Sequence, residues 1–187
     1  GRTGALPDPQ ALARARAAAG PDMFELRAGP PAVRKHDPAT EIDLSAIAKG
    51  YAVDVVADAL AGAGITDFMV EIGGEILARG ERPDGRPWQI GIEQPDPGAR
   101  RVRRVIALHN AALATSGDYR NYVDIDGQRY SHTLDPLTGR PISHTLAAVS
   151  VLADRCMWAD AWATALLVLG PDAGPAKATD AGIAALF

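Results

Sequence analysis

The sequence predicts an α+β protein in which an antiparallel β-sheet is flanked by a few helices. Two observations support this prediction. Between residues 67 and 134, short β-like segments follow one another and are separated by tight-turn signals such as Asp84-Gly85 and Asp126-Gly127. This pattern favours antiparallel pairing over parallel crossovers. Segments rich in alanine and leucine, with helical spacing of their apolar residues, lie before and after that run.

The expected elements follow from local signals along the chain. Asp8 is a helix N-cap, Gly29-Pro30-Pro31 is a hairpin turn, and Gly62 and Gly64 mark a helix end. In chain order we expect a helix over 9–19, a hairpin of 23–29 and 32–36, a helix from Ile47 to Leu60, strands within 67–80, 87–94, 102–110, 111–117 and 122–134, a loop over 134–142, a buried strand at 145–153, a helix over 157–170, a short helical piece over 171–182 and a terminal strand at 183–187.

Length and charge narrow the class of protein. A chain of 187 residues with 47% hydrophobic residues can form one packed domain, so a single domain over residues 1–187 is expected. A net charge of −4 argues against a nucleic-acid partner, because phosphate binding needs concentrated positive charge. The one local exception is the basic run Arg100, Arg101, Arg103 and Arg104, whose alternation with Val102 indicates a strand with a solvated basic face.

The remaining global features leave compartment and redox environment open. Cys156 is the single cysteine, so no intramolecular disulfide forms, and a buried small apolar side chain fits it better than a nucleophile. The sequence has no run of about 18 apolar residues. The chain opens without a methionine, so a leader or lipid anchor is neither indicated nor excluded.

Asp160 and Thr164 stand out in the apolar run ADAWATALLVLG, residues 159–170. They are four residues apart and therefore share one face of the expected helix. One interpretation places Asp160 on an exposed edge or near the helix N-terminus, where negative charge is favourable. The other makes the carboxylate and the hydroxyl two oxygen ligands of Mg²⁺, whose remaining positions are filled by water and substrate phosphates.

The segment Asp43-Leu44-Ser45-Ala46-Ile47-Ala48-Lys49-Gly50 supports two interpretations as well. Asp43-x-Ser45 before an apolar helix is a plausible N-cap. Alternatively, a helix N-terminus with small residues lets a ligand approach the backbone, while Lys49 places a cation near bound phosphate.

A cluster of hydroxyl-bearing residues forms the third candidate site. It comprises residues 114–119 (ATSGDY) and 129–136 (RYSHTLDP), which can be ordinary turn sequences. His132 lies between Ser131 and Thr133 beside the expected loop, and it has the most polar sequence setting of the four histidines. It is a candidate catalytic residue, with a structural role as the alternative.

Five blocks in order resemble the ApbE family, the FAD:protein FMN transferases once called thiamine biosynthesis lipoproteins. The blocks are IDLSAIAKGYAVD, VEIGGEILARG, PWQIGIEQP, ATSGDYRNYVDIDGQRYSHTLDPLTGRPI and ADAWATALLVLG. They span about residues 41 to 170, while the residues before 41 resemble the family's middle region. The resemblance implies a T-fold-like α+β domain and indicates that the family's N-terminal portion, which forms part of the flavin pocket, is absent from this chain.

The resemblance also implies roles for individual residues. Asp160 and Thr164 match the family's side-chain ligands of Mg²⁺, and Ala46 matches the residue whose backbone carbonyl completes the protein's share of the metal shell. Asp43, Lys49 and Leu134 match positions that contact FAD. His132 matches the motif histidine to which a catalytic role is attributed.

The activity implied is the Mg²⁺-dependent cleavage of FAD, with transfer of FMN to a Thr or Ser hydroxyl of a target protein and release of AMP. Family targets include subunits of membrane redox complexes. Two alternatives stay open: a FAD pyrophosphatase that yields FMN and AMP, and a flavin-binding fragment without turnover. Family members are mostly extracytoplasmic and membrane-attached through an N-terminal anchor, and a cytoplasmic location remains an alternative.

Overall fold

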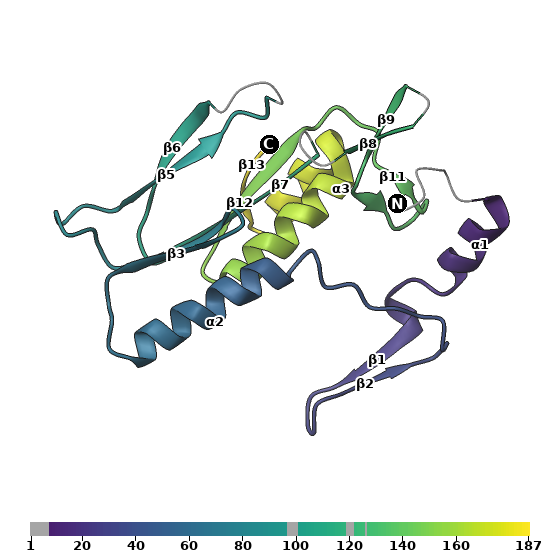
Figure 1. The fold of residues 1–187 in the computed structure, drawn as a ribbon, viewed down its shortest axis with the longest axis horizontal. Coiled ribbons are helices and arrows are strands. Elements are labelled where there is room, and N and C mark those ends of the chain that lie inside the picture. The colour runs from purple at the N-terminus through teal and green to yellow at the C-terminus, as the bar shows by residue number, and fades with distance from the viewer. Residues whose placement is uncertain (1–7, 97–100, 119–121, 126) are drawn as a thin grey trace. The chain divides into compact units, whose positions relative to one another are not determined.

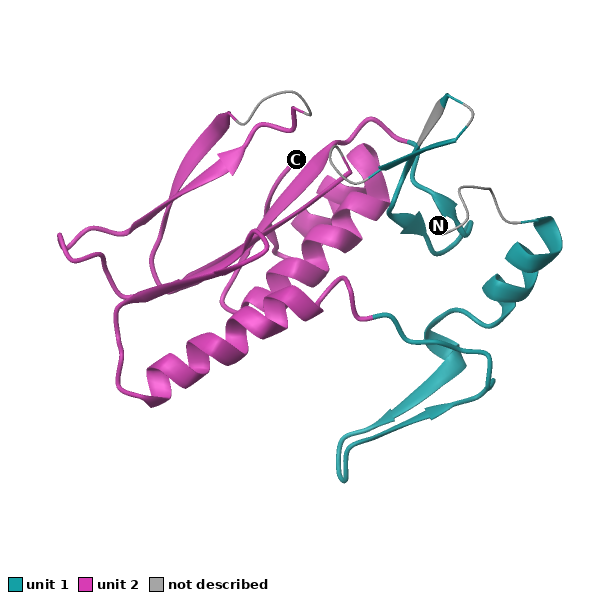
Figure 2. Cartoon of the chain, viewed as in Figure 1, with its two compact units in different colours: residues 1–43, 122–143 teal, residues 44–121, 144–187 magenta. Residues whose placement is uncertain are grey.

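The computed structural model describes residues 8–96, 101–118, 122–125 and 127–187 (Figure 1). The chain forms two compact units, shown in different colours in Figure 2. Unit 1 comprises residues 1–43 and 122–143, and unit 2 comprises residues 44–121 and 144–187. Unit 1 is therefore built from two stretches of chain that are far apart in the sequence.

Unit 2 contains a five-stranded sheet with the strand order β13-β12-β7-β4-β3. The strands are β3 (Phe68–Ile72), β4 (Glu75–Arg79), β7 (Ala111–Gly117), β12 (Ala148–Ala153) and β13 (Ala184–Leu186). All neighbouring strands in this sheet are antiparallel, as the short segments and tight turns predict. The predicted α+β class is confirmed.

Two helices, α2 (Ala48–Gly62) and α3 (Cys156–Asp180), pack on one face of this sheet (Figure 1). Alternation along the strands explains which residues they cover. Leu77 and Ala112 share a core cluster with Val53 and Ala57 of α2 and Cys156 of α3. Because successive strand residues point to opposite faces, the neighbours of Leu77 and Ala112 face the other side of the sheet.

The opposite face of the sheet packs against a hairpin of β5 (Trp88–Glu93) and β6 (Val102–Leu108). Ala78 and Leu113 form a second core cluster there with Ile90, Ile92 and Leu108. Arg101, just before β6, and Arg103 and Arg104 within it are exposed, so these basic side chains are solvated as predicted. Arg104 lines a hollow with Ile106 and Leu113 on the side of the hairpin that faces the sheet, so the prediction that the arginines share one face is wrong. Arg100 and Asp126 lie outside the described residues.

Helix α3 changes direction at Gly170, whose φ of 80° and ψ of −172° are not helical. Pro171 follows this kink directly and begins the second helical segment, as the missing N–H and fixed φ of proline allow at a helix start. The ring of His144 lies against Gly170, so a side chain there would collide with it. The two helical pieces predicted over 157–170 and 171–182 therefore meet at this glycine.

Unit 1 contains α1 (Pro9–Ala17), a 3-10 turn (Pro21–Met23) and three two-stranded sheets. The sheets pair β1 (Phe24–Arg27) with β2 (Ala32–Lys35), β8 (Tyr122–Ile125) with β9 (Gln128–Ser131), and β10 (Leu134–Asp135) with β11 (Arg140–Pro141). The Asp8 carboxylate caps α1 by accepting the N–H groups of Gln10 and Ala11 at 2.9 Å, which confirms the predicted cap. The segment 134–142, predicted as a loop, forms the short β10–β11 pair around a turn.

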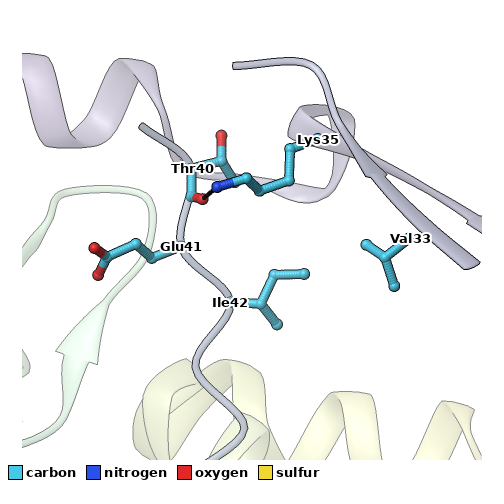
Figure 3. A pocket seen from close by; sticks show the side chains of 5 residues that line it. All are labelled: Val33, Lys35, Thr40, Glu41 and Ile42. Atoms are coloured by element: carbon cyan, nitrogen blue, oxygen red, sulfur yellow. Dashed lines mark hydrogen bonds between the residues drawn. The ribbon is translucent and has the colours of Figure 1, made fainter. Parts of the chain in front are cut away.

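A shallow hollow in unit 1 is lined by side chains from β2 and from the segment that follows it (Figure 3). Its lining residues are Val33, Lys35, Thr40, Glu41 and Ile42. The Lys35 ammonium donates to the carbonyls of Thr40 at 2.7 Å and Pro38 at 2.9 Å. These bonds hold the 38–40 backbone beside β2, so the amine serves the local fold.

Candidate active site

The chain enters α2 through a turn centred on Ala46. The Leu44 carbonyl accepts the N–H groups of Ile47 at 3.0 Å and Ala48 at 2.9 Å, and the helix starts at Ala48. Ile47 is the N-cap and makes no side-chain capping bond. The predicted cap by Asp43-x-Ser45 is therefore wrong, because Ile47 and neither of these residues occupies the N-cap position.

Gly50 brings the first turn of α2 against α3. A Cβ atom at Gly50 would lie 2.7 Å from the Cys156 carbonyl carbon and 2.8 Å from Asp160 Cβ, closer than real side chains approach. The absence of a side chain allows the Gly50 N–H to donate to Asp160 Oδ2 at 2.9 Å. In a continuous α-helix this N–H would instead donate to the Ala46 carbonyl.

Asp160 lies in the interior of unit 2, with 3% of its surface exposed. The interpretation that placed it on an exposed helix edge is therefore wrong. Burial raises the pKa of the Asp160 carboxyl, while the Gly50 N–H and the Lys49 ammonium act in the opposite direction. The net rise means that its negative charge is incompletely compensated by the protein.

Thr164 follows Asp160 by one turn of α3, as the four-residue spacing predicts. Its Oγ1 is 2.8 Å from Ser116 Oγ on β7. If the Thr164 hydroxyl donates to Ser116, its lone pairs stay available to another group. Ser116 thus fixes the Thr164 side chain. The sequence analysis included Ser116 in the cluster of hydroxyl-bearing residues and did not predict this contact with Thr164.

Lys49 forms an ion pair with Glu75, a residue that the sequence interpretation missed. Lys49 Nζ lies 2.6 Å from Glu75 Oε1, and Glu75 is almost fully buried while Lys49 is half exposed. Glu75 Oε2 is buried without a hydrogen-bond partner among the described residues. Burial raises the pKa of Glu75, Lys49 lowers it, and Asp160 raises it further. The Gly73-Gly74 turn immediately before Glu75 was the available signal for this site.

Asp54, also missed at the sequence level, joins α2 to the start of α3. Its carboxylate accepts the N–H groups of Cys156 at 2.8 Å and Met157 at 3.0 Å, and Arg155 Nε lies 3.3 Å away. The adjacent Cys156 is fully buried, which confirms the predicted buried small side chain, and this burial raises the pKa of its thiol to about 12.

His132 and Leu134 belong to unit 1, on the backbone between β9 and β11, and both are exposed. The backbone around them is anchored: the Thr133 N–H donates to Ser131 Oγ at 3.2 Å, and the Thr133 carbonyl accepts the Ile142 N–H at 3.0 Å. Asp43 is the last residue of the first stretch of unit 1 and is also exposed.

Four predicted site residues belong to unit 2, where the first turn of α2 lies against α3 at Asp160. Lys49 is in that first turn, Ala46 precedes Gly50 by four residues, and Thr164 follows Asp160 by one turn of α3. Asp43, His132 and Leu134 are in unit 1, and their place in a common site stays a prediction. Among the described residues no group of three or more His, Cys, Asp or Glu side chains gathers as a metal cluster.

The fold is similar to that of a defined class of solved structures, the flavin transferases. The flavin transferase ApbE of Vibrio cholerae superimposes with a TM-score of 0.87 and 45% identity, covering 100% of this chain and 58% of that chain. The flavinyl transferase ApbE of Pseudomonas stutzeri, in its apo form, gives a TM-score of 0.84 and 44% identity, with 97% and 55% coverage.

The sequence relatives give the same assignment. The chain is 53% identical over 144 residues to the FAD:protein FMN transferase of Vibrio cholerae, covering 77% of this chain and 43% of that protein. It is 46% identical over 169 residues to the one of Haemophilus influenzae, covering 89% and 49%. The model of the ApbE family matches residues 1–187. The chain belongs to the ApbE family, and it spans about half the length of the curated relatives it matches.

Proposed function

We propose that this protein cleaves the pyrophosphate of FAD and attaches FMN through a phosphoester bond to a Thr or Ser of an acceptor protein, releasing AMP. Family membership and the name FAD:protein FMN transferase borne by its relatives support the proposal. The acceptor that we propose is a flavoprotein subunit of a redox complex, as in other members of the family.

The observation that best supports this function is the buried carboxylate of Asp160 one turn before Thr164. A buried carboxylate is costly unless it is paired or bound to a cation, and burial raises the pKa of this one. The Gly50 N–H is directed to Asp160 Oδ2, so the Ala46 carbonyl is not needed for that helical bond. These three oxygens fit Mg²⁺, which prefers oxygen ligands and keeps water in its shell.

We propose that the Ala46 carbonyl, Asp160 and Thr164 hold Mg²⁺. When bound, the ion neutralises the negative charge that develops on phosphoryl oxygens during cleavage of a phosphoanhydride. The chain's own residues contribute the positioning. Ser116 orients the Thr164 hydroxyl, Gly50 orients Asp160, and Lys49 offers an ammonium to a phosphate oxygen at the start of α2.

For His132 we propose that the imidazole accepts the proton of the acceptor hydroxyl, with stabilisation of the transferred phosphate as the second possible role. Its exposed position on an anchored turn of unit 1 is compatible with either role. Asp43 and Leu134 are proposed FAD contacts. Leu134 is a largely exposed apolar side chain, as expected of a residue that covers a ligand.

The experiment that tests the activity incubates the protein with FAD and Mg²⁺, with and without a Thr-containing acceptor peptide, and measures AMP release and covalent FMN separately. Transfer supports the proposal. AMP release without attachment identifies a pyrophosphatase, and FAD binding without AMP release identifies a flavin-binding fragment. We expect His132→Ala to abolish transfer and to leave FAD binding largely intact. Undiminished transfer by this variant would contradict the role of His132.

The metal site is tested by thermal unfolding with Mg²⁺ and FAD. A ligand at one hundred times its dissociation constant stabilises the native state by about 2.7 kcal/mol. We expect Asp160→Asn to remove the Mg²⁺-dependent part of this stabilisation. The control is Asp58→Asn on the exposed side of α2, and this variant should keep the Mg²⁺-dependent stabilisation. An unchanged Mg²⁺ effect in Asp160→Asn would exclude this carboxylate as a ligand.

A further inference from the structure

We propose that Glu75 is a positioning residue that holds the Lys49 ammonium in place for a phosphate oxygen of the substrate. This inference rests on the proposed function, in which Lys49 contacts the pyrophosphate of FAD. None of the sequence patterns predicts a role for Glu75, and the inference is drawn from its contacts in the structure. They concern the place of Glu75 on the sheet, its ion pair with Lys49 and the N–H donors of Lys49 that this ion pair leaves available.

The turn before Glu75 fixes the carboxylate on the side of the sheet that α2 covers. Gly73 and Gly74 both adopt positive φ angles, 63° and 100°, and join β3 to β4 in a tight hairpin. Glu75 is the first residue of β4 and is two residues before Leu77, so both side chains point to the same face. Leu77 packs in the cluster beneath α2, and Lys49 is in the first turn of that helix.

The pair is asymmetric in burial. Glu75 is 1% exposed at its side chain, whereas Lys49 is 47% exposed, and the two charged atoms are 2.6 Å apart. The carboxylate therefore contributes a fixed anchor, and the lysine remains accessible to a ligand. A free lysine side chain samples many rotamers, so a rigid partner greatly narrows the positions of its ammonium.

The Lys49 ammonium has N–H donors left to bind an anion. An ammonium has three N–H donors, and the bond to Glu75 Oε1 uses one of them. Two donors of a half-exposed group are then available to phosphate oxygens. Glu75 Oε2 is buried without a partner among the described residues, so this carboxylate is not optimally paired for stability. A buried carboxylate at this position is better explained by its effect on Lys49.

A purely electrostatic role and a positioning role of Glu75 predict opposite changes in anion affinity for Glu75→Gln. If Glu75 only adds negative charge to the site, Glu75→Gln removes a repulsion and an anion binds more tightly. If Glu75 positions Lys49, the same change frees the ammonium and the anion binds more weakly. The positioning effect must also disappear when Lys49 is absent, because Glu75 then has nothing to hold.

The test is a double-mutant cycle read by calorimetry with inorganic pyrophosphate and Mg²⁺ on wild type, Glu75→Gln, Lys49→Ala and the double variant. We expect Glu75→Gln to weaken binding about tenfold in the Lys49 background and to have no effect in the Lys49→Ala background. Glu81→Gln, an exposed glutamate on the same unit, is the matched control and should bind as wild type. Glu75→Asp, which keeps the charge on a shorter side chain, should also weaken binding.

Tighter binding by Glu75→Gln, or an equal effect in both backgrounds, would overturn the proposal. So would wild type that does not bind pyrophosphate, since Lys49 would then hold no anion. Folding of each variant is checked by circular dichroism and by its urea midpoint. The cycle measures only pyrophosphate binding, so its result stands whether or not the same preparation cleaves FAD.

Discussion

Replacing Gly50 by alanine tests the close contact of α2 with α3. In an ordinary helix interior, Gly→Ala stabilises a protein by about 0.5–1 kcal/mol, because glycine loses more backbone entropy on folding. Here the added Cβ would lie 2.7 Å from the Cys156 carbonyl carbon and 2.8 Å from Asp160 Cβ. The first contact is to backbone, which cannot move aside by a rotamer change, so the two helices must separate.

The magnitude follows from two costs. Overpacking of a core typically costs about 1–3 kcal/mol. Separation of the helices also lengthens the bond from the Gly50 N–H to the buried Asp160 carboxylate, and a hydrogen bond to a charged group contributes about 1.5–3 kcal/mol. Allowing for partial relaxation and for the gain in helix propensity, we expect Gly50→Ala to lower the free energy of unfolding by about 2 kcal/mol.

The assay is urea unfolding followed by circular dichroism, with the slope m compared between variants. Gly62→Ala is the matched control in the same helix, because a Cβ there meets nothing within 4 Å. It should be neutral or stabilise by up to about 1 kcal/mol. Gly50→Ala should also weaken Mg²⁺-dependent FAD binding, since Asp160 is displaced. If both variants gained stability alike, the inferred helix contact would be refuted.

Two further predictions concern the start of α3. Asp54→Ala removes the carboxylate that accepts two N–H groups of α3 and should lower the free energy of unfolding by about 3 kcal/mol. Asp58→Ala, which loses only exposed ion pairs, should change it by less than about 0.5 kcal/mol in the same urea titration; equal losses would contradict the capping role. Because burial raises the pKa of Cys156 to about 12 from an ordinary 9.0, its contribution to stability should be complete below pH 9 and decline between about pH 9 and 12. Urea midpoints of wild type and Cys156→Ser over this range measure the decline, and rapid labelling of the native thiol by a disulfide reagent at pH 8 would contradict its burial.

Local signals predicted most of the elements because the physics that forms them is local. The Asp8 cap, the glycines that mark the end of α2 and the Asp84-Gly85 turn each depend on neighbours within a few positions. The cap before α2 was wrong for the same reason: the spacing of Asp43 and Ser45 fits a cap, and only the turn at 44–47 shows that the helix begins later. A pattern identifies a candidate cap and does not fix the residue at which the helix starts.

The candidate site was predictable where its residues share one helix and unpredictable where they do not. Asp160 and Thr164 are one turn apart, so their common face follows from helical spacing alone. The partner of Lys49 is 26 positions away on β4, and that of Thr164 is 48 positions away on β7. Such pairs depend on how the sheet packs against the helices, and neither charge pattern nor propensity encodes that packing.

The arrangement of α2 and α3 explains why two incompletely compensated carboxylates persist in the interior of unit 2. Asp54 ties the start of α3 to α2, and Gly50 lets the helices approach until a backbone N–H reaches Asp160. A core built for stability alone would place apolar side chains at Glu75 and Asp160, because replacing buried charges by packed apolar groups is often stabilising. The fold instead gives Asp160 a fixed backbone donor at Gly50 and gives Glu75 the half-exposed ammonium of Lys49. This arrangement supports the proposal that a metal ion and an anionic substrate complete the charges of the site.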